Sequence, residues 1–192
     1  MDKLVDYIHI KNAIPTELAD FVGKTILIDL LNGNMDTDNN QVIGSKIKYS
    51  HSSCEAVMLK LWKKIEEETG LEICPTYSFI RYYTKGMSLD RHTDRPSCEI
   101  SATVCLTYES SKLWPICAKD ANGNEVSIEL DKGDLMIYRG CDIEHWRDEL
   151  EDGWWLQVFI HFVDKNGPHY PEYKFDKREV PFIYEEIDFM DK

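Results

Sequence analysis

The chain has 192 residues, of which 43% are hydrophobic and 30% charged, with a formal net charge of -13. These values exclude a disordered or low-complexity chain. The acidic balance argues against nucleic acid as a partner, because binding a phosphate backbone requires a concentrated positive surface. A chain of this length can bury one substantial core, so we expect a single domain over residues 1–192.

Membrane and disulfide signals are missing from the sequence. No stretch approaches the roughly 18 consecutive apolar residues of a membrane span, and the N-terminus, MDKLVDYIHIKN, lacks the long apolar segment of a secretory signal. We therefore expect no membrane association and predict a cytoplasmic location. No CxxC pair occurs, which favours reduced core thiols over disulfides or a zinc site. The cysteines are Cys54, Cys74, Cys98, Cys105, Cys117 and Cys141.

Helical periodicity dominates about residues 15–70, the predicted helical support. After Pro15, the segment TELADFVGKTILIDLL places apolar residues at helical spacing, with Thr16 as the expected N-cap. A second helix is predicted from about Ser52 to Thr69, where Gly70 provides the C-terminal stop. The polar segment between them, NGNMDTDNNQ, is predicted to be a loop.

From about residue 75 to 165 the pattern changes to short β-branched and aromatic runs separated by turn residues. These runs are TYSFIRYY, EISATVCLTY, KLWPICA, EVSIEL, DLMIY and WWLQVFIHFV. Asn122-Gly123 predicts a hairpin, and residues 132–134 predict a second tight turn. Helices followed by six or more strands indicate an α+β protein with a β-sandwich or barrel.

The last segment, about residues 166–192, is rich in proline, tyrosine and charge and shows no clear periodicity. We expect it to wrap the sheet as an extended tail. Full disorder is disfavoured because it would leave many aromatic side chains in water. These side chains are Tyr170, Tyr173, Phe175, Phe182 and Tyr184.

The clearest chemical signal is the pair His92 and Asp94. They stand two residues apart, so on a strand both side chains point to the same face. A second histidine, His145, follows the predicted core strand GDLMIY. A histidine in a strand is often an ordinary half-buried residue. Two histidines and a carboxylate together, however, form the facial triad of non-haem Fe(II) oxygenases, whereas zinc more often takes three ligands and a water.

Residues 75 to 165 resemble the prolyl 4-hydroxylase-like branch of the 2-oxoglutarate and Fe(II)-dependent dioxygenases. The resembling segments are RYYxxG at 81–86, HTD at 92–94, SATVCL at 101–106, KGDLMIY at 132–138 and then His145. The resemblance implies a double-stranded β-helix, a cupin-like jelly roll with N-terminal helices packed on one sheet. It also implies a dioxygenase that uses Fe(II), dioxygen and 2-oxoglutarate, with ascorbate as a candidate reductant.

In this family a tyrosine just before the HxD element commonly binds 2-oxoglutarate, and Tyr83 is better placed for this than Tyr82. The far carboxylate of 2-oxoglutarate usually meets an Arg or Lys nine or ten residues after the distal histidine. Trp154 and Trp155 occupy these positions here. A buried dianion without a cationic partner would be costly, so another residue must supply the charge.

Two arginines are candidates for this anchoring charge. Arg147 is the first and Arg81 the second, because guanidinium can bind a carboxylate through two hydrogen bonds. Gln157 and His161 share the face of Trp155 and are candidates to assist. The alternative for Arg147 is a surface residue paired with a carboxylate of the acidic loop WRDELEDG.

The substrate is expected to enter beside the iron motif. Arg95, Pro96, Cys98 and Glu99 follow that motif and are predicted to line the entrance. Trp114 and Trp146 are the predicted aromatic walls, and the alternative for Trp114 is core packing. The resemblance implies hydroxylation of an unactivated C–H, first of all in a prolyl residue of a peptide or protein. A free amino acid or another small metabolite is the alternative substrate.

A second class of function stays open. The chain could be a non-catalytic jelly-roll binding module that retains metal ligands, or a cupin-like protein that uses another metal. The missing basic anchor keeps this alternative under consideration.

Overall fold

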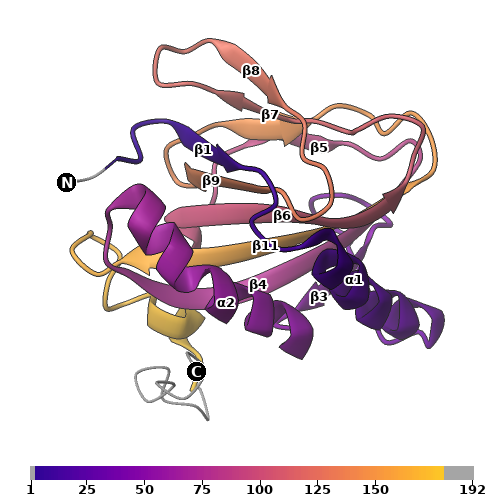
Figure 1. Ribbon diagram of the computed structural model, residues 1–192, viewed down its shortest axis with the longest axis horizontal. Coiled ribbons are helices and arrows are strands. Elements are labelled where there is room, and N and C mark those ends of the chain that lie inside the picture. The colour runs from indigo at the N-terminus through magenta and orange to yellow at the C-terminus, as the bar shows by residue number, and fades with distance from the viewer. Residues whose placement is uncertain (1–2, 180–192) are drawn as a thin grey trace.

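Two antiparallel β-sheets face each other in the computed structural model, which describes residues 3–179. The larger sheet has the strand order β1-β9-β6-β11-β4-β3-β2, and the smaller has the order β5-β10-β7-β8. The elements are β1 (Tyr7–Ile10), α1 (Thr16–Leu31), β2 (Asp36–Thr37), β3 (Lys46–Tyr49), α2 (Ser52–Thr69), β4 (Ile73–Thr84), β5 (Leu89–His92), η1 (Pro96–Cys98), β6 (Ile100–Glu109), β7 (Ile116–Lys119), β8 (Glu125–Ile128), β9 (Leu135–Arg139), β10 (His145–Arg147), β11 (Trp154–Asp164) and η2 (Lys174–Lys177). Figure 1 shows both helices against the outer face of the larger sheet, with the smaller sheet on its other side. The predicted α+β jelly roll is confirmed.

Both predicted helices are present, and one of their predicted ends is wrong. Thr16 is not the N-cap of α1, because Pro15 takes that position and Thr16 already lies inside the helix. The Thr16 hydroxyl lies 3.5 Å from the carbonyl of Lys132 instead. Gly70 does end α2, in the left-handed conformation at φ 73° that a glycine adopts without strain.

Alternation along β11 divides the protein into two cores. Leu156, Val158 and Ile160 point outward and pack in the cluster beneath the helices. Trp155 points inward and packs between the two sheets. The same inward face continues to His161, so β11 runs from an apolar core into a cavity that His161 lines.

The two predicted turns and the free thiols of the cysteines agree with the sequence analysis. The β7–β8 hairpin closes around Asn122-Gly123, with Lys119 paired to Glu125, and Gly133 adopts the positive φ of the second tight turn. All six cysteines are free thiols. No helix in the described part of the chain is long and apolar enough to cross a membrane.

Two expectations about irregular segments are corrected. The predicted polar loop contains β2, which pairs with β3 at the edge of the larger sheet. The C-terminal segment is not extended where it is described, because residues 168–177 form turns and η2. Arg178 fastens this segment by donating to Ser50 Oγ at 2.6 Å and to the carbonyl of Thr76. Phe182 and Tyr184 lie outside the described residues.

Candidate active site

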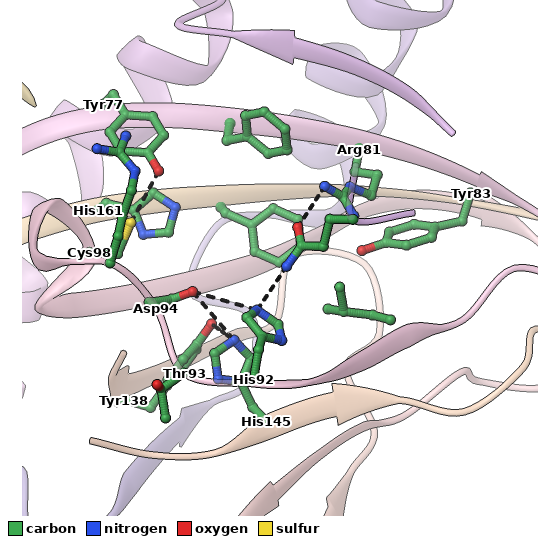
Figure 2. Close-up of a pocket in the computed structure, with 15 residues that line it drawn as sticks. Tyr77, Arg81, Tyr83, His92, Thr93, Asp94, Cys98, Tyr138, His145 and His161 are labelled. Atoms are coloured by element: carbon green, nitrogen blue, oxygen red, sulfur yellow. Dashed lines mark hydrogen bonds and ion pairs between the residues drawn. The ribbon is translucent and has the colours of Figure 1, made fainter. Parts of the chain in front are cut away.

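Two short strands of the smaller sheet bring the predicted metal ligands together. His145 on β10 is paired directly with His92 at the end of β5, and their rings lie 4.3 Å apart. The Nε2 atoms of both histidines lie 3.7 Å from Oδ1 of Asp94. The ligand atoms of all three residues lie within 4.8 Å of one another. Figure 2 shows the three side chains pointing toward one another. This is an arrangement that can hold a divalent metal.

The backbone orients both histidines so that Nε2 faces the candidate metal position. Nδ1 of His92 lies 2.8 Å from the carbonyl of Asp90, and Nδ1 of His145 lies 3.0 Å from the carbonyl of Ile143. A carbonyl can only accept, so each Nδ1 carries the proton and each Nε2 keeps a lone pair. The side chains of Gln41 and Tyr138 donate to these lone pairs at 3.1 and 3.3 Å.

The hydrogen bonding of Asp94 leaves one of its carboxylate oxygens available for a metal. Ser101 Oγ donates to Oδ2 at 2.7 Å, while Oδ1 faces the histidines. Behind the carboxylate lies Gly140, where an added Cβ would be 2.5 Å from Asp94 Oδ2 and 2.2 Å from the carbonyl of Cys98. Only a glycine fits so close to the ligand.

A cavity of about 270 Å³ opens between the sheets around these ligands. Residues of β4 and β11 form the wall opposite β5 and β10. The lining residues are Gln41, Tyr77, Phe79, Arg81, Tyr83, Leu89, His92, Thr93, Asp94, Arg95, Cys98, Tyr138, His145, Phe159 and His161. Figure 2 shows Arg81 and Tyr83 toward one end of this cavity, and Tyr77, Cys98 and His161 toward the other.

Polar atoms with unused hydrogen bonds gather at the Arg81 end. Arg81 is 3% exposed, and its Nη2 is held by Asp38 Oδ2 at 3.0 Å and Gln41 Oε1 at 2.8 Å. Among residues 3–179, no hydrogen-bond partner is present for its Nε and Nη1 atoms or for the Tyr83 hydroxyl. Burial raises the pKa of Tyr83, and the charges of Arg81 and Arg147 oppose that rise. Buried donors without partners are uncommon, so this end suits an anionic ligand.

The comparisons with known proteins give structural matches only. No protein-family model and no curated protein matches the sequence. A prolyl-4-hydroxylase from Pseudomonas putida matches with a TM-score of 0.68 and 17% identity, over 84% of this chain and 94% of its own. SnoN, an alpha ketoglutarate-dependent epimerase from nogalamycin biosynthesis crystallised with Fe3+ and alpha ketoglutarate, matches with a TM-score of 0.71 and 10% identity, over 93% and 87%.

A third match is a prolyl hydroxylase from Trichoplax adhaerens in complex with a hypoxia inducible factor peptide fragment. Its TM-score is 0.67 at 15% identity, over 83% of this chain and 84% of its own. The chain has the fold of the 2-oxoglutarate and Fe(II)-dependent oxygenases. Because hydroxylases and an epimerase share this oxygenase fold, the fold alone does not assign the reaction.

Within the oxygenase fold, the other two predicted co-substrate residues lie away from the cavity. Arg147 is no surface residue: it is 1% exposed, donates to the carbonyl of Trp114 and lies 4.6 Å from the Trp114 ring. Gln157 is fully buried, accepting from Trp155 Nε1 at 2.9 Å and donating to Thr103 at 2.6 Å. Neither residue lines the cavity. His161, predicted to assist, does line it.

Of the six predicted entrance residues, Arg95 and Cys98 line the cavity. Glu99 turns away to accept from the backbone N–H of Asp164 at 2.9 Å, and burial raises its pKa. Trp114 packs edge-on against Tyr83 in the core between the sheets. This is the core packing that the sequence analysis gave as its alternative. Trp146 follows His145 on β10 and therefore points to the opposite face, where Arg91 covers its ring at 3.6 Å.

Several cavity residues escaped the sequence analysis. Gln41 comes from the segment predicted as a plain loop and touches both Arg81 and His92. Tyr138 was assigned only to a core strand. Tyr77 was not singled out either, and its hydroxyl lies 3.1 Å from the thiol of Cys98. Alternation along TYSFIRYY was the available signal for Tyr77, since it predicts Tyr77, Phe79, Arg81 and Tyr83 on one face.

Proposed function

We propose that the protein is a dioxygenase that binds Fe(II) through His92, Asp94 and His145 and uses 2-oxoglutarate as co-substrate. The observation that carries the proposal is the shared cavity: the three ligand groups and the unpartnered donors of Arg81 and Tyr83 open into the same space. The two histidines and one carboxylate fit Fe(II), and the buried donors fit a carboxylate.

The residues of the site have distinct tasks in this proposal. Fe(II) and 2-oxoglutarate, when bound, supply the oxidising chemistry for hydroxylating an unactivated C–H, with succinate and CO₂ as by-products. The carbonyls of Asp90 and Ile143 hold His92 and His145 in the tautomer that binds metal. Ser101 holds Asp94 by donating to its Oδ2.

Arg81 replaces the missing anchor on β11 in this proposal. Trp155, at the usual anchor position, is fully buried and stacks on Tyr108 at 4.2 Å. Arg81 reaches the same interior from β4, which pairs with β11 so that Gln157 faces Arg81. Arg147 is also buried, and its Nε and Nη2 have no hydrogen-bond partner among the described residues, but it does not line the cavity. Arg81 is therefore the better candidate for the far carboxylate of 2-oxoglutarate.

The substrate is proposed at a coarser level. The prolyl hydroxylases among the structural matches favour a prolyl residue of a peptide or protein, and a free amino acid or small metabolite is the second choice. Ascorbate as reductant, a cytoplasmic location and one functional domain over residues 1–192 complete the proposal. The six free thiols are consistent with a reducing compartment.

A non-catalytic metal-binding module is the competing function. The bulky Trp155 at the usual anchor position favours it, because that position in this chain offers no charge to a co-substrate. The two functions differ in whether the protein binds 2-oxoglutarate at the metal and consumes it.

Anaerobic titration of Fe(II) and then 2-oxoglutarate tests the proposal. We expect a weak visible charge-transfer band that needs both components and disappears in Asp94→Ala. In Arg81→Gln the 2-oxoglutarate affinity should fall roughly 10- to 100-fold, as expected for losing a charge-assisted hydrogen bond. Arg147→Gln is the matched variant and should change affinity less. Iron binding without a band would instead favour the binding module.

A further inference from the structure

At the rim of the cavity, Arg95, the residue that follows Asp94, already binds a carboxylate of the protein itself. The guanidinium of Arg95 donates to both oxygens of Asp176, at 2.7 and 2.9 Å. The hydroxyl of Tyr49 donates to the same carboxylate at 2.5 Å. Asp176 is distant in sequence and belongs to η2 of the C-terminal segment. The rim therefore contains a complete carboxylate-binding site.

The site is continuous with the cavity through Tyr77. The Arg95 guanidinium lies 4.7 Å over the Tyr77 ring, and Tyr77 stacks on Tyr49 at 4.9 Å. Ser97 Oγ fixes Arg95 Nη1 at 2.8 Å. Arg95 and Tyr77 both line the cavity that holds the metal ligands. A molecule with its carboxylate on Arg95 can therefore extend toward the metal position.

The wall of the cavity formed by β4 and β11 suits the apolar part of a ligand. Tyr77 and Phe79 come from β4 and Phe159 from β11, and the two phenylalanine rings lie 6.5 Å apart. The end of the cavity opposite Arg95 carries Arg81 and Tyr83, which the proposed function assigns to 2-oxoglutarate. The cavity thus offers two carboxylate positions, one at each end, with Tyr77 beside Arg95 and the Phe79 ring 5.5 Å from the Arg81 guanidinium.

The backbone that carries Asp176 is suited to release. Phe175, Asp176 and Lys177 are consecutive residues with φ of 51°, 54° and 60°, a left-handed conformation that is unfavourable for residues with side chains. The hydrogen bonds to Arg95 and Tyr49 help offset this cost. A competing carboxylate that takes these bonds would let the segment relax.

We propose that Arg95 and Tyr49 bind the carboxylate of the substrate, and that Asp176 occupies this position until the substrate displaces it. The substrate is then a small carboxylic acid with an apolar or aromatic body, such as a free amino acid. This is the second of the two substrates proposed above, and the carboxylate site at Arg95 is the reason to prefer it to a prolyl residue inside a protein. The inference rests on the proposed function only in treating this ligand as the molecule to be oxidised.

Benzoate and benzamide are the probes, since they differ in the carboxylate alone. Each is titrated by calorimetry, anaerobically and with Fe(II) and saturating 2-oxoglutarate, into the wild type, Asp176→Asn and Arg95→Gln. We expect Asp176→Asn to bind benzoate at least tenfold more tightly than the wild type, because the internal competitor loses its charge. Benzamide should show no such gain, and Arg95→Gln should lose the preference for benzoate.

Glu172→Gln is the control, because it breaks the exposed Glu172–Lys177 pair of the same segment without touching Arg95; its benzoate affinity should equal that of the wild type. Equal benzoate affinity in Asp176→Asn and the wild type, or equal binding of benzoate and benzamide to Asp176→Asn, overturns the inference. Asp176→Ala replaces Asp176→Asn if the latter fails to fold. The visible band, recorded in the same samples, reports separately on the proposed function.

Discussion

At the scale of single residues, the candidate metal site depends on the absence of a side chain at Gly140. A methyl group at position 140 would lie within 2.6 Å of Ser101 Oγ and within 2.5 Å of Asp94 Oδ2. Both atoms are needed to hold the ligand carboxylate in place. Gly140→Ala should therefore displace Asp94 and lower Fe(II) affinity by roughly 10- to 100-fold, as expected when the support of a metal ligand is lost. Anaerobic Fe(II) titration measures this.

Ser101→Ala separates steric displacement from the loss of a hydrogen bond. It removes the bond to Asp94 Oδ2 and introduces no clash, so its Fe(II) affinity should lie between those of the wild type and Gly140→Ala. Wild-type affinity in Gly140→Ala would show that the carboxylate can relax without leaving the metal.

A second prediction at this scale concerns the folding stability of the protein in acid, which depends on its buried histidines. Burial lowers the pKa of His161 to about 4, and burial also lowers the pKa of His145. Between pH 6.5 and 4 the unfolded chain binds a proton that folded His161 does not, so stability is present above this window and is lost as pH falls through it. The loss from His161 amounts to about 3 kcal/mol in the metal-free protein.

Urea unfolding of metal-free protein at pH 7.5 and 4.5 checks the prediction. The first value lies above the pH window of His161 and the second lies near its lower end. His161→Gln keeps a donor for Ser101 but cannot titrate, so its stability should fall less between the two pH values. An identical fall in both proteins would mean that other groups dominate the acid response.

At the scale of elements, helix α1 lies unusually close to strand β6. A Cβ at Gly23 would be 2.7 Å from Thr107 Cγ2. Gly23→Ala should gain about 1 kcal/mol of helix propensity but lose about 1–3 kcal/mol to overpacking, so we expect a net loss of stability. Adding Thr107→Ser, which removes the clashing methyl, should restore it. Additive effects in this double-mutant cycle would contradict the close contact.

The β5–β10 pairing is the element that assembles the site. The pairing of His145 with His92 places both rings on the inner face of the smaller sheet. A slip of one residue would turn either histidine outward, so the register of these short strands decides whether the site exists.

At the scale of the whole molecule, the two sheets meet around Trp155. This side chain is fully buried between them, against Tyr108 and Trp114, whereas Trp154 points to the other face and stacks on Tyr82. Trp155→Ala should lower the free energy of unfolding by about 3–5 kcal/mol. Trp154→Ala should cost about 1 kcal/mol. Urea unfolding of both variants gives the comparison, and equal losses would contradict the two-core arrangement.

The sequence by itself determined the long elements and the three candidate metal ligands. Periodicity is local, so both helices and the long strands could be read from residue order. The strand at His92 was also expected, but Asp94 lies beyond the end of β5 rather than on it. The short strands β1, β2 and β3 escaped detection because their pairing, rather than their composition, makes them strands.

Only the tertiary structure decided which charged and aromatic side chains share the cavity. The sequence analysis placed Arg147 before Arg81 as the anchoring charge, yet of the two only Arg81 lines the cavity. Trp114 and Trp146 lie elsewhere because strand parity and sheet packing direct them away. Arg95 meets Asp176 across 81 residues of chain. Such contacts depend on the packing of distant segments, which no local pattern encodes.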